Sequence, residues 1–273
     1  MKKKAARSVK LLYDGEPVMD GAGVKITRMI GTRELNYIDP FLLLDQFKSE
    51  NSDDYMAGFP NHPHRGFETV TYMIHGLSRH QDSMGYSGLL TQGSAQWMTA
   101  GKGVVHSEMP EPDQGLLWGY QLWVNLPAKL KMTEPRYQDI PSDNIPEFRQ
   151  GGELVRIIAG EYSSLKGAAE TLTDVLYFDV HLEANYNFTY DLENGKNGFI
   201  YVYRGSLNMD SKNVKKGILA LLGSEGPIDL KSGPKGANFL FIAGAPLNEP
   251  IVRGGPFVMN TRGEIMQAFA DFQ

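Results

Sequence analysis

Short apolar stretches separated by glycine and proline recur along the first half of the chain. From about residue 20 to residue 126 these stretches are rich in β-branched and aromatic residues, and Gly or Pro bounds each of them. This punctuation is typical of β-strands joined by tight turns, and the spacing predicts a sandwich or barrel of antiparallel strands. The predicted strands cover residues 23–30, 68–74, 95–99 and 117–126.

A second series of strands follows a change in composition. The stretch from Pro127 to Gly152 is polar and rich in proline, which is typical of a linker between domains. Beyond it, the predicted strands cover residues 154–159, 175–182, 198–203, 218–222 and 238–243. We therefore expect an all-β fold of two barrels in tandem, with an N-terminal barrel over residues 1–135, a linker over 136–152 and a C-terminal barrel over 153–273.

The end of the chain has helical spacing. Thr261 and Glu264 are separated as in a capping box, and Ile265, Phe269 and Phe272 fall at positions i, i+4 and i+7. We expect a short C-terminal helix that packs on a barrel.

Length, composition and charge narrow the class of protein. A chain of 273 residues with 41% hydrophobic residues is long enough for about two domains. The net charge of −5 lacks the positive excess that nucleic-acid binding requires, so we expect no direct contact with nucleic acid. No apolar run is long enough for a membrane helix or a signal peptide, which leads us to expect a cytoplasmic protein.

The chain has no cysteine, so any metal ion must be held by His, Asp, Glu or backbone oxygen. The chain has six histidines, and some of them are closely spaced. His62 and His64 flank Pro63 in an extended segment. Residues i and i+2 of a strand point to the same face, so both imidazoles can reach one ion. This doublet by itself provides half of a metal site.

The second doublet, His106 and Glu108, follows a glycine turn with the same i, i+2 spacing. A neighbouring strand that presents one imidazole and one carboxylate would complete a set of three nitrogens and one oxygen. Such a set leaves positions open for water, substrate or dioxygen. Glu68 competes for the carboxylate position if the strand that holds His62 and His64 continues through it, and the residues alone leave both carboxylates open.

Residues 59–72 (FPNHPHRGFETVTY) and 96–110 (QWMTAGKGVVHSEMP) resemble the two signature blocks of the pirin family. Residues 39–45 (DPFLLLD), 121–127 (QLWVNLP) and 255–261 (GPFVMNT) are similar to the same family, so the resemblance covers nearly the whole chain. It implies a member of the cupin superfamily with two double-stranded β-helix barrels and one mononuclear metal, usually Fe²⁺, in the first. The implied metal ligands are His62, His64, His106 and Glu108, while Glu68 is not a ligand.

Two positions depart from the family pattern. His75 stands where the family usually has an acid, and Asn61 stands where Asp is common. Neither is a ligand position, so we expect the metal to be retained and the charge of the cavity to differ. The C-terminal barrel contains only His181, and we expect that barrel to bind no metal.

The resemblance implies a quercetin 2,3-dioxygenase, an oxidoreductase that cleaves a flavonol ring with O₂ and releases CO. Glu108 would then be both a metal ligand and the base that deprotonates the flavonol. Imidazole and carboxylate ligands also accept Mn, Ni, Cu or Zn. The alternatives are a metal- and redox-dependent binding protein that regulates a transcription factor or a metabolic enzyme, and a cupin isomerase. We expect a monomer that binds a flavonol and O₂ and can also bind a protein partner.

Overall fold

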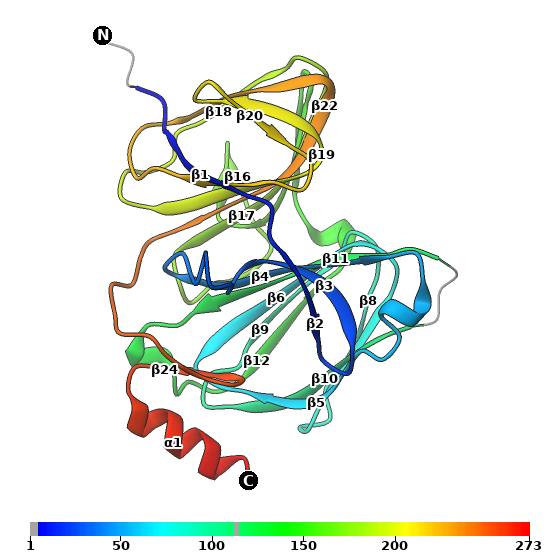
Figure 1. The fold of residues 1–273 in the computed structure, drawn as a ribbon, viewed down its shortest axis with the longest axis vertical. Helices are drawn as coiled ribbons and strands as arrows, with labels where there is room; N and C mark the ends of the chain where they lie inside the picture. The colour runs from blue at the N-terminus through cyan, green and yellow to red at the C-terminus, as the bar shows by residue number, and fades with distance from the viewer. Residues whose placement is uncertain (1–4, 112–114) are drawn as a thin grey trace. The chain divides into compact units, whose positions relative to one another are not determined.

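The structure is a computed structural model that describes residues 5–111 and 115–273. Its described residues are mostly β-strands, with one short α-helix near the C-terminus (Figure 1). The chain forms two compact units, and each is a barrel of antiparallel strands. The expected all-β fold with a C-terminal helix is therefore confirmed.

The first barrel comprises residues 16–144 and 247–273. Its larger sheet has seven strands in the order β12 (Arg136–Ile140), β9 (Ala95–Thr99), β6 (Phe67–His75), β11 (Leu117–Asn125), β4 (Phe41–Ser49), β3 (Val24–Ile30) and β2 (Glu16–Asp20). Its second sheet has four strands in the order β5 (Phe59–His64), β10 (Val104–Pro110), β7 (Ser78–Asp82) and β8 (Ser87–Leu90). Short 3₁₀ turns lie at Ser52–Asp54, Ala128–Leu130 and Ser142–Asn144.

The second barrel comprises the chain up to Gly15 and residues 145–246. Its main path of strands runs β1 (Val9–Tyr13), β21 (Leu219–Leu222), β19 (Asn197–Met209), β22 (Ile228–Gly244), β17 (Val175–Leu182), β14 (Glu153–Ala159) and β13 (Glu147–Gln150). In addition, β18 (Asn187–Tyr190) pairs with β22, and β20 (Lys212–Lys215) pairs with β19. A separate pair joins β15 (Glu161–Tyr162) to β16 (Leu165–Lys166).

The barrels do not follow one another along the chain as the sequence led us to expect. The N-terminal strand β1 pairs with β21 of the second barrel. Arg7, which is fully buried just before β1, donates to five backbone carbonyls of that barrel, among them those of Gly226 and Gly223. The first fifteen residues are therefore part of the second barrel.

The C-terminal segment is part of the first barrel. It forms the pair β23 (Val252–Gly254) and β24 (Phe257–Met259) and then helix α1 (Arg262–Asp271). The predicted capping box at the start of α1 is present. Ile265 packs with Phe257 and Phe272, whereas Phe269 is 40% exposed although its ring also contacts Phe257. The helix therefore belongs to the first barrel, whereas its position in the chain had led us to expect it at the end of the second.

The expected linker at 136–152 is largely made of edge strands. β12 pairs with β9 of the first barrel, and β13 pairs with β14 of the second. An edge strand has one side free of sheet neighbours, so it accommodates the polar residues and nearby prolines that made this stretch resemble a linker.

Candidate metal centre

Three histidines from strands β5 and β10 meet inside the first barrel. β5 and β10 are antiparallel neighbours (Figure 1), and His62 lies directly opposite His106 in their register. One ring nitrogen from each of His62, His64 and His106 lies within 4.8 Å of the other two. The two doublets in the sequence predicted that these three imidazoles converge, and the structure brings them together.

The local sequence explains why the strand that carries His62 and His64 lies at the edge of its sheet. β5 contains Pro60 and Pro63, and a strand with two prolines can only be an edge strand because proline has no N–H for the sheet. β5 is at the edge of its sheet and pairs with β10 on one side only. Gly66, with φ of +90°, then turns the chain out of β5 before β6 begins at Phe67.

Hydrogen bonds to the backbone orient two of the imidazoles. Nδ1 of His62 donates to the carbonyl of Pro60 at 2.8 Å, and Nδ1 of His64 donates to the carbonyl of Pro256 at 3.2 Å. With Nδ1 protonated, the lone pair of each ring is on Nε2. The two Nε2 atoms are only 3.0 Å apart, an arrangement in which two lone pairs repel unless a proton or a cation lies between them.

His106 supplies a third imidazole nitrogen, and this nitrogen makes no hydrogen bond in the described structure. Its side chain is fully buried, and neither ring nitrogen has a hydrogen-bond partner in the described structure. Burial is the main cause that lowers the pKa of His106 to about 3, and the charges of His62 and His80 add to the effect. Burial likewise lowers the pKa of His64 well below its usual value. Neutral imidazoles are the form that binds a metal ion.

These residues fit a divalent metal ion. Metal–imidazole bonds are about 2.0–2.1 Å long, so two ligands at a right angle have nitrogens roughly 3.0 Å apart. The separation of the Nε2 atoms of His62 and His64 equals that value. A cation would also give the buried ring of His106 the partner that it lacks. The three histidines could therefore hold one metal ion.

Glu108 lies near this cluster in the sequence and on the same strand as His106, but its carboxylate is hydrogen-bonded to Thr71 and Gln121. Glu108 is buried on β10, two residues beyond His106. Thr71 Oγ1 donates to its Oε1 at 3.0 Å, and Gln121 Nε2 donates to both carboxylate oxygens at 3.0 and 2.8 Å. Glu108 is not among the residues whose ligand atoms converge within 4.8 Å, so its role as a fourth ligand stays a prediction.

Glu68 is also outside the cluster. It lies on β6, beyond the turn at Gly66, and is fully buried. Thr99 Oγ1 donates to its Oε1 at 2.7 Å. Because the chain turns between β5 and β6, the face on which Glu68 lies is not set by the alternation of residues along β5.

A cavity of about 610 Å³ opens beside the histidines. His62 and His64 line it together with the flat or apolar side chains of Phe59, Trp123 and Pro256. The indole of Trp123 packs edge-on against His64, with ring centroids 5.1 Å apart. The polar residues of the wall are Asp20, Arg28, Asp45, Asn61, Gln121 and Arg253. The cavity therefore suits a flat aromatic molecule with polar groups at its rim.

Several of these residues were not identified from the sequence. Trp97, the tryptophan closest in the chain to the second doublet, is fully buried in the core, whereas Trp123 lines the cavity. The place of Trp123 in the QLWVNLP block was the one signal that could have identified it.

The two residues that depart from the family pattern lie in different places. Asn61 lines the cavity as a polar neutral residue. His75 is at the end of β6, where its Nδ1 donates to the carbonyl of Leu116 at 2.7 Å.

His80 occupies a buried polar cluster on β7, opposite Glu108. Its Nε2 contacts the amide of Gln96 and is 3.2 Å from Asp139 Oδ2. Its ring stacks with that of Tyr137. These contacts support the strand next to the one that carries His106.

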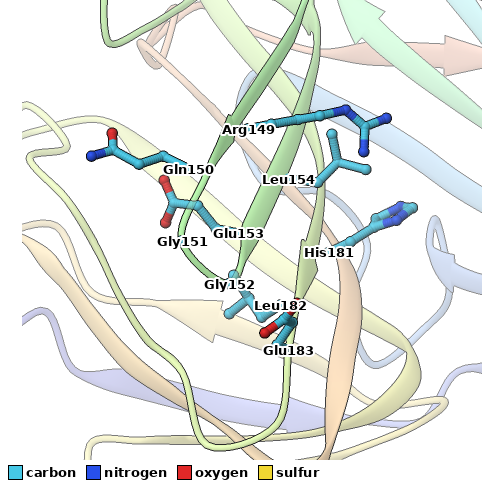
Figure 2. Close-up of a pocket in the computed structure, with 9 residues that line it drawn as sticks. All are labelled: Arg149, Gln150, Gly151, Gly152, Glu153, Leu154, His181, Leu182 and Glu183. Carbon is cyan, nitrogen blue, oxygen red and sulfur yellow. The ribbon is translucent and has the colours of Figure 1, made fainter.

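The second barrel has its own surface pocket of about 460 Å³ (Figure 2). Arg149, Leu154 and His181 project from the neighbouring strands β13, β14 and β17. His181 Nε2 is 3.1 Å from Asp179 Oδ2 and 2.9 Å from the hydroxyl of Tyr203. In the described part of this barrel, no three side chains of the metal-binding kind converge as those of the first barrel do.

The fold and this cluster define a cupin protein with two barrels and a three-histidine centre in the first. The family model of pirin matches residues 23–124, and that of the pirin C-terminal cupin domain matches residues 177–273. The chain belongs to the pirin family.

Known proteins resemble this chain over nearly its full length. A protein of Pseudomonas aeruginosa, provisionally named a quercetin 2,3-dioxygenase, is 48% identical over 98% of this chain and 96% of its own length. Human pirin is 41% identical over 98% of this chain and 93% of its own length. The crystal structure of a quercetin 2,3-dioxygenase from Acinetobacter baumannii superposes with a TM-score of 0.89 at 37% identity, and covers 98% of this chain and 97% of that one. No helix of the described residues is long and apolar enough to cross a membrane.

Proposed function

We propose that this protein is a metal-dependent dioxygenase of the quercetin 2,3-dioxygenase type. A flavonol and O₂ would be its substrates, and a ring-opened phenolic ester and CO its products. The observation that carries the proposal is the position of His62 and His64, which belong to a converging imidazole cluster and also line an aromatic-walled cavity. The names of the relatives in Pseudomonas aeruginosa and Acinetobacter baumannii support the same reaction class.

We propose Fe²⁺ as the metal, held by His62, His64 and His106 with Glu108 as the fourth ligand. Mn, Ni, Cu or Zn would also accept such a donor set. When bound, the ion would lower the pKa of a coordinated enol and supply the redox chemistry that O₂ requires.

The protein's own groups would position the flavonol and take its proton. Phe59 and Trp123 offer aromatic surfaces for the flat rings. Glu108 is the candidate base, because it is a buried carboxylate on β10, the strand that also carries His106. Thr71 and Gln121 hold that carboxylate in place. To accept the proton, Glu108 must give up one of these hydrogen bonds or its bond to the ion.

The test combines metal analysis with oxygen uptake on quercetin. Protein purified without added metal should contain about one ion per chain, and oxygen uptake should yield CO. The His106→Ala variant should lose both metal and turnover. Turnover that continues after the metal is lost would refute the proposed centre.

Two variants of Glu108 separate its roles. Glu108→Ala should abolish turnover, whereas Glu108→Gln should retain metal but lose turnover, because an amide can occupy the same space without accepting a proton. The matched control is Glu34→Gln, which removes an exposed carboxylate of the same barrel and should leave turnover unchanged. Full activity in both Glu108 variants would exclude this residue as ligand and base.

A further inference from the structure

Two arginines are among the residues that line the cavity beside the histidines, and the surroundings of their guanidinium groups differ. Arg28 Nε and Nη2 donate to the two oxygens of Asp45 at 2.9 and 2.7 Å. Nη2 of Arg28 also contacts Asp20 at 2.6 Å. The charge of Arg28 is thus matched by carboxylates of the protein itself.

Arg253 has no such partner among the described residues. Its Nη2 donates to the carbonyls of Leu42 at 2.6 Å and Asn36 at 3.3 Å. These contacts fix the side chain but carry no negative charge. Nε has no acceptor in the described structure and is shielded from water. Burial, followed by the nearby charge of Arg28, lowers the pKa of Arg253.

A guanidinium in this situation favours an anion from outside the protein. It stays charged at neutral pH, and its planar N–H groups match the geometry of a carboxylate. Since backbone carbonyls already hold the side chain in place, little side-chain entropy is lost when a ligand binds. The carboxylates of Asp20 and Asp45 do not compete for Arg253, because both bind Arg28.

The remaining wall restricts the shape of the ligand. Phe59, Trp123 and Pro256 give the cavity flat apolar surfaces that suit an aromatic ring. The geometry points to Arg253 as a specificity residue that selects aromatic hydroxy-carboxylates over their uncharged analogues in the cavity beside His62 and His64. This inference rests on the proposed function in that it takes this cavity as the substrate site. It extends that function by adding a carboxylate to the class of ligand that the site prefers.

The test compares two probes of similar shape, one with a carboxylate and the other with an uncharged carboxamide. The dissociation constants of 2,4-dihydroxybenzoate and 2,4-dihydroxybenzamide are measured by intrinsic tryptophan fluorescence, with metal-free protein and in the absence of O₂. Because a hydrogen bond to a charged group is stronger than one to a neutral group, wild-type protein should bind the carboxylate about tenfold or more tightly than the amide.

Variants of Arg253 assign that preference to one side chain. Arg253→Gln should bring the two dissociation constants to within about twofold, and Arg253→Lys should retain part of the preference through its charge. The matched control is Arg33→Gln, which removes an exposed positive charge of the same barrel and should leave the preference intact. Circular dichroism and the unfolding midpoint of each variant establish that it is folded.

The outcomes separate this inference from the proposed function. Equal binding of the two probes by the wild type, or a preference that survives in Arg253→Gln, would overturn the role of Arg253. Absence of oxygen uptake on quercetin would overturn the proposed dioxygenase. A protein that prefers the carboxylate through Arg253 but consumes no O₂ with quercetin would support the first and refute the second.

Discussion

The substitution His106→Leu should have opposite effects on stability in the metal-free and metal-loaded protein. In the metal-free state both ring nitrogens of His106 are buried without partners. An unsatisfied buried polar group costs about 1–3 kcal/mol of folding free energy. Leucine is of similar size and has no polar atoms, so it removes this cost. The metal-free variant should be as stable as the wild type, or more stable by up to about 3 kcal/mol.

Metal binding should reverse this order. An ion at a free concentration 100 times its dissociation constant stabilises the wild type by about 2.7 kcal/mol. The variant retains only His62 and His64 of the imidazole cluster, and it should gain much less. The difference in stability between the two proteins should therefore change by about 2 kcal/mol or more when the metal is added.

Urea unfolding at pH 7.5, with chelator and then with excess Zn²⁺, measures both differences. At this pH the imidazole is neutral in the folded and unfolded states, so its protonation does not contribute. The control is His80→Leu. His80 is as deeply buried as His106, but its Nε2 contacts Gln96 and Asp139, so its loss should destabilise both states. Destabilisation of metal-free His106→Leu by as much as His80→Leu, or equal stabilisation of this variant and the wild type by Zn²⁺, would refute the proposed role of His106.

Two further predictions concern the turn that follows the histidine strand. The buried ammonium of Lys131 donates to the carbonyls of Gly66 and Val258, and burial lowers its pKa from 10.5 to about 8. Between these pH values the unfolded chain binds more protons than the folded one, so stability rises with pH. Wild-type protein should therefore gain about 3 kcal/mol relative to Lys131→Met between pH 8 and 10.5. Urea unfolding across that range measures the gain, and a constant difference would contradict it. The second prediction is that Gly66→Ala destabilises the protein by several kcal/mol, because the new Cβ would lie 2.0 Å from the carbonyl oxygen of Val258 at a φ of +90°. Gly85→Ala, with φ of +89° and no atom within 4 Å, should cost only about 1 kcal/mol in the same assay, and equal losses at the two sites would exclude the clash as the cause.

Local patterns in the sequence predicted nine of the 24 strands in the described residues and the convergence of the three histidines. The expected strands at 95–99 and 175–182 coincide with β9 and β17. The spacing of His62 and His64 gave their common direction because a strand has a fixed period of two residues. The pairing of β5 with β10 then places His106 opposite His62, and this completes the cluster of three imidazoles.

Features that depend on distant partners could not be predicted in this way. The direction of the Glu108 carboxylate is set by Thr71 and Gln121, which belong to two other strands. The cavity side chains of Trp123 and Arg253 come from β11 and β23, which are far apart in the sequence. The periodicity within one segment cannot predict contacts between side chains from different strands.

Local patterns also could not predict that the N-terminal segment belongs to the second barrel and the C-terminal segment to the first. No strand was predicted at residues 9–13, and nothing in that segment identifies the partner of β1, which is β21, about 200 residues away. Likewise the helical spacing after Thr261 predicted α1 but not the barrel that it covers. Domain boundaries drawn from composition assume that neighbours in sequence are neighbours in space, and both ends of this chain violate that assumption.

The contact between His64 and Pro256 has a consequence for the order of events during synthesis. The ribosome makes the histidine strand well before the backbone carbonyl that orients its second imidazole, because His64 and Pro256 are 192 positions apart in the sequence. Arg65, the next residue, forms its ion pair with Asp271, 206 positions further along the chain. A nascent chain therefore carries the three histidines for a long part of translation without the segment that completes their surroundings. We expect tight and selective uptake of an ion to begin only after residues 256–271 have been made and have folded onto the first barrel.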